Sequence, residues 1–133
     1  MDVGDLKYLQ IMQNKAARIV TLSPPRAERS MMFDKLGWLT VNQLIFYHSV
    51  ITVFKIRSSK EPEYLAEALT KDSRNDRIVI PNLDLKLAHK SFTLRGAESW
   101  NLLPQNVRKN TKIGCFKKLA KKWTIENVPR FLE

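Results

Sequence analysis

The chain has 133 residues, of which 44% are hydrophobic, with four Gly and six Pro. This length fits a single domain, and the composition excludes a wholly disordered, low-complexity or collagen-like chain. The formal net charge is +10, and it is uneven, because residues 86–133 hold 11 Lys/Arg against 3 Asp/Glu. Such a basic segment favours an anionic partner, either nucleic acid or acidic lipid.

Cysteine and histidine are too few for a disulfide framework or a structural zinc site. Cys115 has no second cysteine to pair with, and together with His48 and His89 it cannot supply four ligands. We therefore expect an intracellular protein, in the cytoplasm or nucleus, with no cofactor and with Cys115 buried as a small hydrophobe. Apolar runs are interrupted well before about 18 residues, and no secretory signal follows Met1, so we expect no membrane span.

The first predicted element is a helix from Asp5 to about Thr21, which residues 23–25 (Ser-Pro-Pro) end. Its apolar residues fall near one face: Leu6, Leu9, Met12, Ala16, Ile19 and Val20. A short helix follows over residues 30–36. Ser30 is a suitable N-cap for it, and Gly37 suits the left-handed position after it.

The segment 40–43 (Thr-Val-Asn-Gln) has the form of a capping box, with Gln43 three residues after the hydroxyl of Thr40. It predicts a long helix to about Arg57. Residues 50–54 have high strand propensity, but they continue the helical period, so we assign them to this helix.

Pro62 is suited to the first turn of a short helix that ends at Leu69. Residues 71–77 are predicted as a loop. Short extended pieces are expected at 78–80, 83–87 and 90–94, with loops as the alternative.

The last third of the chain predicts two helices. One spans residues 96–103 and stops at Pro104, and the other is capped by Thr111 and runs to about Glu126.

The final helix has the most distinct pattern in the chain. At about 100° per residue, Phe116, Leu119, Ala120 and Trp123 share one sector. Four lysines occupy the opposite side, and three basic residues precede them: Lys117, Lys118, Lys121 and Lys122, after Arg108, Lys109 and Lys112. This face predicts contacts to successive phosphates, with affinity but little base selectivity. The alternatives are a core-docking helix whose solvated face is lysine and, third, a membrane-surface helix.

No self-sufficient active site is found in the sequence. A nucleophile motif, a phosphate loop and an Asp-Asp pair for two-metal chemistry are all missing. We therefore predict that the chain is not an enzyme.

An ordered set of short strings resembles a known family. The strings are Leu9 with Gln13-Asn14-Lys15-Ala16-Ala17-Arg18; Leu36-Gly37-Trp38-Leu39 with Gln43 and Tyr47; Pro62-Glu63-Tyr64-Leu65; Ser91-Phe92; Arg95-Gly96; Trp100-Asn101-Leu102-Leu103-Pro104; and Phe116-Lys117-Lys118-Leu119. Together they resemble the region C-terminal to the polymerase core in reverse transcriptases of LINE-type, non-LTR retrotransposons, particularly the jockey-like group. The resemblance covers nearly the whole chain.

This resemblance implies a helical thumb and post-thumb region that helps to hold a template–primer duplex. Lys15 and Arg18 would then contact the nucleic-acid backbone, Trp100 and Leu103 would lie in the core, and Asn101 would cap or bridge locally. The polymerase palm, with its aromatic–x–Asp–Asp motif, and the endonuclease domain are missing from this chain. The resemblance therefore implies a fragment, a decayed reading frame or a remnant with another use.

We predict a mainly α-helical single domain over residues 1–133, a small bundle of about five helices with room for a short β element around residues 78–94. The expected function is non-catalytic binding of the backbone of RNA, DNA or a hybrid. The alternatives are a protein-interaction module, which binds a protein partner or self-associates through formerly palm-facing apolar surfaces, and a folded relic without function.

Overall fold

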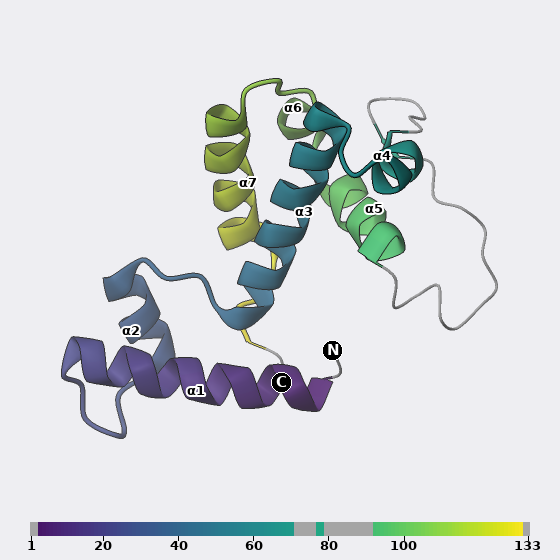
Figure 1. Ribbon diagram of the computed structural model, residues 1–133. Helices are drawn as coiled ribbons and strands as arrows, with labels where there is room; N and C mark the ends of the chain where they lie inside the picture. Colours follow the sequence, from purple (N-terminus) through teal and green to yellow (C-terminus); the bar gives the residue numbers. More distant parts are fainter. Residues whose placement is uncertain (1–2, 71–76, 79–91, 132–133) are drawn as a thin grey trace. The chain divides into compact units, whose positions relative to one another are not determined.

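The computed structural model describes residues 3–70, 77–78 and 92–131, and these residues are mainly helical (Figure 1). The helices in these ranges are α1 (Val3–Thr21), α2 (Arg29–Leu36), α3 (Val41–Ser59), α4 (Glu63–Leu69), α5 (Phe92–Leu102), α6 (Gln105–Arg108) and α7 (Ile113–Asn127). The predicted mainly α fold is confirmed, and the described residues contain no strand.

The predicted β element falls largely on residues 79–91, which lie outside the described residues. Its last part was predicted wrongly, because residues 92–94 form the first turn of α5. A helix from Phe92 to Leu102 completes three turns, so the local strand preference yields to the longer helical segment.

The chain divides into two compact units. Unit 1 comprises Met1–Ile45 and Ile125–Glu133, and unit 2 comprises Phe46–Thr124. Each unit has its own buried cluster of side chains.

The core of unit 1 is small and lies where α2 packs on α1. Ala17, Met32 and Phe33 are buried there, and Trp38 and Phe131 meet the Phe33 ring edge-on at centroid distances of 6.2 Å and 5.7 Å. In edge-to-face contacts the positive edge of one ring lies against the negative face of the other, and this attraction helps to fix the ring positions.

Beside the buried Ala17, the face that α1 turns to the rest of unit 1 carries amide side chains. Gln10 is buried, and its Oε1 accepts a hydrogen bond from the Val41 backbone N–H at 3.0 Å. Gln13 donates from Nε2 to the Leu39 carbonyl at 2.8 Å. These amides satisfy backbone groups that would otherwise be buried without partners, so hydrogen bonds contribute to the docking of α1 alongside the packing of Ala17.

The apolar face of α1 is exposed instead. Five of its large side chains are exposed to solvent: Tyr8, Leu9, Met12, Ile19 and Val20. An amphipathic helix of a globular protein ordinarily buries this stripe, so α1 inverts the usual arrangement.

α1 ends in a Schellman motif whose left-handed residue is a leucine. Leu22 has φ 54°, its N–H donates to the Ile19 carbonyl, and the Ser23 N–H donates to the Arg18 carbonyl. Glycine is the usual residue at this position, because other L-residues incur a steric cost there.

α2 shows one confirmed cap and one wrong one. Gly37 lies after its end at φ 68°, and its N–H donates to the Phe33 carbonyl, as predicted. Ser30 was predicted to be the N-cap, but it lies inside the helix, and Glu28 occupies the cap position without a side-chain bond.

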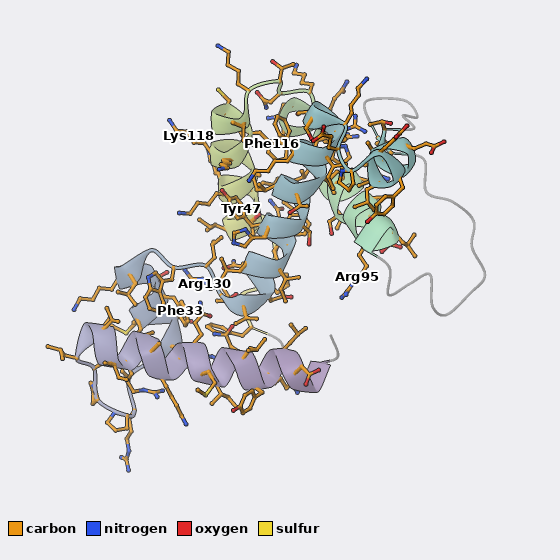
Figure 2. The ribbon with its side chains drawn as sticks, viewed as in Figure 1. Phe33, Tyr47, Arg95, Phe116, Lys118 and Arg130 are labelled. Carbon is orange, nitrogen blue, oxygen red and sulfur yellow. The ribbon has the colours of Figure 1, made fainter. Side chains whose placement is uncertain are left out.

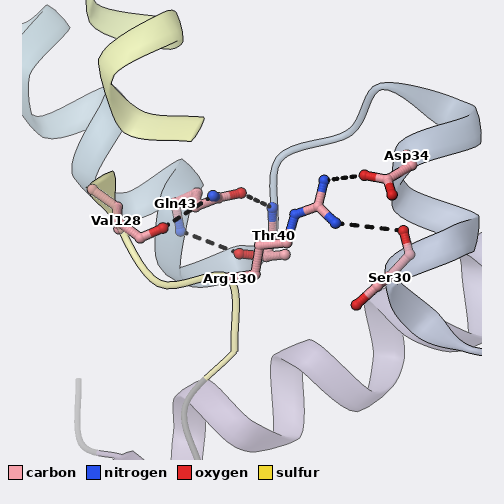
Figure 3. A network of polar contacts seen from close by, with 6 residues as sticks. All are labelled: Ser30, Asp34, Thr40, Gln43, Val128 and Arg130. Atoms are coloured by element: carbon pink, nitrogen blue, oxygen red, sulfur yellow. Dashed lines mark hydrogen bonds and ion pairs between the residues drawn. The ribbon is translucent and has the colours of Figure 1, made fainter. Parts of the chain in front are cut away.

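The capping box at the start of α3 is confirmed (Figure 3). The Gln43 N–H donates to the Thr40 hydroxyl at 3.4 Å, and the Thr40 N–H donates to Gln43 Oε1 at 3.2 Å. Gln43 Nε2 also donates to the Val128 carbonyl at 3.1 Å, and Arg130 pairs with Asp34 nearby. The same residues that start α3 therefore anchor the C-terminal segment of unit 1.

Unit 2 is built around three stacked aromatic rings from three helices. Phe116 on α7 stacks on Phe54 of α3 at 4.4 Å and on Trp100 of α5 at 5.4 Å. Leu103 is buried in the same cluster, so the expected core roles of Trp100 and Leu103 are confirmed. The helical assignment of residues 50–54 is also confirmed, since Val50, Val53 and Phe54 face this core from α3.

Asn101 bridges to Ile78, 23 positions earlier in the chain, and not locally as the resemblance implied. Its Oδ1 accepts from the Ile78 N–H at 2.8 Å, and its Nδ2 donates to the Ile78 carbonyl at 2.9 Å. Both backbone groups of a buried residue are thereby satisfied by one side-chain amide.

Further helix boundaries differ from prediction. Pro62 is the N-cap of α4 and lies just before its first turn, and the short helix α6 was not predicted. Thr111 does not cap α7, because the Lys112 carbonyl accepts from the Phe116 N–H and Lys112 thus occupies the cap position.

Among the described residues, none of the helices taken singly has the length and hydropathy needed to cross a membrane, although α2 and α3 would meet these requirements as a bent pair.

Candidate nucleic-acid interface

α7 separates an apolar face from a basic one. Phe116, Ala120 and Thr124 are buried in unit 2. The Thr124 hydroxyl donates to the Ala120 carbonyl, so this buried donor has a hydrogen-bond partner. Phe46 packs on Trp123 at 5.3 Å and closes one edge of this face. The packing fixes the rotation of α7 about its axis and so decides which side chains face solvent.

The four predicted lysines all lie on the solvent side. Lys117, Lys118, Lys121 and Lys122 are exposed, and Figure 2 shows Lys118 pointing away from α3. Lys117 and Lys118 are each followed four residues later by another lysine, so the lysines form two pairs. The two members of each pair are about 6 Å apart along the helix axis.

Within the described part of the chain, the side chains of these lysines have no hydrogen bond or ion pair to another residue. Four like charges on one turn and a half of helix repel one another, and an external anion would relieve that repulsion. The arrangement is suited to a row of phosphates.

The three basic residues before α7 separate into two groups. Lys109 and Lys112 are exposed and continue the positive charge toward the start of the helix. Arg108 is only 7% exposed and is part of the buried interior of unit 2. Its side chain is therefore less accessible to a ligand than the lysines.

Lys15 and Arg18 belong to unit 1. Lys15 is exposed, Arg18 is half-buried, and both line a shallow hollow together with Ile19, Leu22 and Ser23. Arg18 Nε is buried without a hydrogen-bond partner among the described residues. These two cations therefore lie beside apolar side chains, in surroundings unlike the lysine face of α7.

Cys115 is exposed on α7, and the prediction that it is buried was wrong. The residue next to it, Phe116, is the one that enters the core. Cys115 is three residues before Lys118 and therefore lies beside the lysine face. The chain contains no other cysteine, so this thiol can report on that face.

Among the described residues, no three of His, Cys, Asp and Glu lie close enough to hold a metal ion. Burial raises the pKa of the Tyr47 phenol, which packs against the unit 2 core. The cause is the loss of hydration that the phenolate would suffer.

A pocket of about 220 Å³ lies in unit 1, with Lys7, Arg29 and Arg130 on its wall. Arg29 stacks over the Phe131 ring at 3.8 Å, and Arg130 pairs with Asp34. Arg29 and Arg130 are thus used in holding the C-terminal segment, which is a structural role.

Comparisons with protein-family models, with curated proteins and with solved structures gave no match to this chain.

Proposed function

We propose that this chain is a non-catalytic module that binds the sugar–phosphate backbone of nucleic acid through the lysine face of α7. By the lysine face we mean Lys117, Lys118, Lys121 and Lys122, with Lys109 and Lys112 at its start. RNA, DNA and a hybrid duplex are all candidate ligands, because lysines recognise phosphates and carry little base selectivity.

The observation that supports this proposal is four exposed lysines held on one side of α7 without an acidic partner in the described residues. Their rotation is fixed by the buried Phe116 and Ala120 on the other side. A preorganised row of cations binds a polyanion with release of its counterions. This gives affinity that falls steeply with salt.

We also propose that the module derives from the region C-terminal to the polymerase core of a LINE-type reverse transcriptase. The ordered strings of the sequence support this origin, and a grip on a template–primer duplex is the role it implies. The catalytic carboxylates of such an enzyme belong to a palm domain, whose Asp-Asp pair does not occur in these 133 residues.

The test is a salt-titrated binding assay with labelled single-stranded RNA, duplex RNA and an RNA–DNA hybrid. Changing the four α7 lysines to Glu should abolish binding at low salt. A plot of log affinity against log salt should be steeper for the unmodified chain than for any residual binding by the variant, by about three to four in slope. The reason is that the variant lacks four phosphate contacts, each of which releases about 0.9 counterions on duplex DNA. Retained affinity in this variant would contradict the proposed site.

A matched control separates the lysine face from net charge. The variant Lys7→Glu, Lys35→Glu, Lys55→Glu and Lys60→Glu changes four other exposed lysines and lowers the net charge by the same amount. It should retain most of the affinity. Equal loss in both quadruple variants would mean that total charge, rather than the α7 face, attracts the nucleic acid.

A second readout uses Cys115. Bound nucleic acid on the lysine face should slow alkylation of this exposed thiol by a bulky maleimide several-fold, and high salt should restore the rate. Unchanged alkylation at saturating duplex would place the bound nucleic acid away from α7.

A further inference from the structure

The exposed apolar side of α1 is a second surface that calls for an explanation. We define the α1 stripe as Tyr8, Leu9, Met12, Ala16, Ile19 and Val20, all exposed. At about 100° per residue these six lie within one broad sector of the helix, opposite the buried Gln10 and Ala17. The stripe runs for about 18 Å, which is three turns of helix.

Within the stripe the spacing is that of a helix–helix seam. Leu9, Met12, Ala16 and Ile19 are separated by three, four and three residues, as in positions a and d of a heptad. The small Ala16 between larger side chains leaves a hole that a knob from a facing helix can fill. This pattern selects a helical partner over an extended one.

Leu22 extends the stripe and is doubly unfavourable for the isolated chain. It is 91% exposed, and its left-handed backbone conformation is one that glycine adopts without steric cost. The chain has glycine at the equivalent position after α2, namely Gly37. A local choice that lowers stability and exposes a large apolar side chain is typical of a binding site.

The charges beside the stripe decide the kind of partner. Lys15 and Arg18 flank it and form one hollow with Ile19 and Leu22, and Arg18 Nε has no hydrogen-bond partner among the described residues. Asp5, near the start of α1, is the helix's acidic residue. Carboxylates on the facing edge of a partner helix would complement Lys15 and Arg18.

A second copy of this chain fits the stripe less well. Antiparallel pairing that packs Met12 on Ala16 brings the two Lys15 side chains together across the two-fold axis. Parallel pairing aligns the two helix dipoles, and the chain carries a net charge of +10 in either case.

We infer that the α1 stripe, with Leu22, Lys15 and Arg18, is a docking site for an amphipathic helix of a partner protein whose flank is acidic. The apolar stripe supplies affinity by excluding water, and the two cations select the charge of the partner. This inference rests on residues of unit 1 and does not depend on nucleic-acid binding by α7.

The test uses two synthetic helical peptides with the same leucine face, one with Glu and one with Gln at the flanking positions. In anisotropy titrations the Glu peptide should bind the chain about tenfold more tightly than the Gln peptide. Ile19→Gln should weaken the Glu peptide about tenfold, because Ile19 is 74% exposed in the free chain and would be buried in the complex. Lys15→Glu should remove the preference for Glu over Gln.

Two matched controls accompany these variants. Met31→Gln changes an apolar residue of α2 with similar exposure, and Lys7→Glu makes the same charge change on the opposite side of α1. Both should leave the affinity within about twofold. Circular dichroism of each variant checks that the fold is intact.

Four results would overturn the inference. The first is equal affinity for both peptides. The second is Glu-peptide binding that Ile19→Gln leaves intact and the α7 quadruple variant abolishes. The third is a dimer of the free chain in sedimentation that Ile19→Gln dissolves, which would make a second copy the occupant. The fourth is Ile19-dependent binding to anionic vesicles without peptide binding. The duplex assay is unaffected by all four, so failure of this inference and failure of the nucleic-acid proposal can be told apart.

Discussion

Leu22 shows how a single residue can oppose local stability. Its φ of 54° closes the Schellman motif after α1, and its side chain contributes almost nothing to the core. An L-residue in the left-handed helical region costs roughly 1–2 kcal/mol, part of which glycine would return as entropy of the unfolded chain.

We predict that Leu22→Gly raises the free energy of unfolding by about 0.5–1 kcal/mol in urea titrations. The same variant should weaken the Glu peptide. Lys60→Gly is the control, since Lys60 has φ 60° after α3 and should give a similar gain in stability without any loss of peptide binding. A loss of stability in Leu22→Gly would show that the leucine makes contacts that stabilise the fold.

Tyr47 should make stability depend on pH in the alkaline range. Burial raises its pKa, so the folded chain keeps the phenol proton at pH values where the unfolded chain has released it. Its contribution is complete below about pH 10, the ordinary tyrosine pKa, and is lost as pH rises through the folded-state pKa.

Urea unfolding measured between about pH 8 and pH 11 should therefore show a decline above about pH 10 that Tyr47→Phe reduces. Tyr64→Phe, at an exposed position, should keep the full decline. An identical pH profile for Tyr47→Phe and the unmodified chain would contradict the assignment.

At the scale of elements, α7 combines a structural face with a binding face. The Phe116 ring is stacked between Phe54 and Trp100, so three helices meet on one side chain. The orientation of the lysine face depends on this stack, because the helix is held by nothing comparable on its solvent side.

We predict that Phe116→Ala lowers the free energy of unfolding by about 3–5 kcal/mol, the usual cost of removing a buried phenylalanine. Phe116→Leu should lower the free energy of unfolding by clearly less. At low temperature this variant should still bind nucleic acid. A loss below about 1 kcal/mol for Phe116→Ala would mean that the stack contributes little to the core.

At the scale of the whole molecule, the two proposed surfaces belong to different compact units and use different chemistry. The α7 face is basic throughout, whereas the α1 stripe is apolar with a basic edge. Since neither set of side chains includes a residue of the other, variants should separate the two activities.

We predict that Ile19→Gln leaves duplex affinity within about twofold, and that changing the four α7 lysines to Glu leaves the Gln peptide's affinity within the same limit. Crossed titrations of both variants against both ligands measure this. Joint loss of the two activities in either variant would indicate one shared surface or a failure to fold.

The sequence by itself determined much of the helical framework. Prolines and caps act over a few residues, so the capping box of Thr40 and Gln43 and the stop at Gly37 could be predicted. The core role of Trp100 was an expectation from the family resemblance. The separation of lysines from aromatics on residues 113–127 could also be predicted, because a helical period sorts side chains before any packing occurs. By contrast, α6 is too short to give a periodic signal.

Only the tertiary structure decided which face of each helix is covered. On α7 the apolar face is buried, as periodicity suggests, but on α1 the amides of Gln10 and Gln13 are turned inward and the apolar stripe is left to solvent. For the same reason Arg108, expected at the surface, is buried, and Cys115, expected in the core, is exposed. Periodicity shows which side chains of a helix share a face. Which face is buried depends on the backbone groups and side chains that neighbouring segments present, and those contacts exist only in the folded chain.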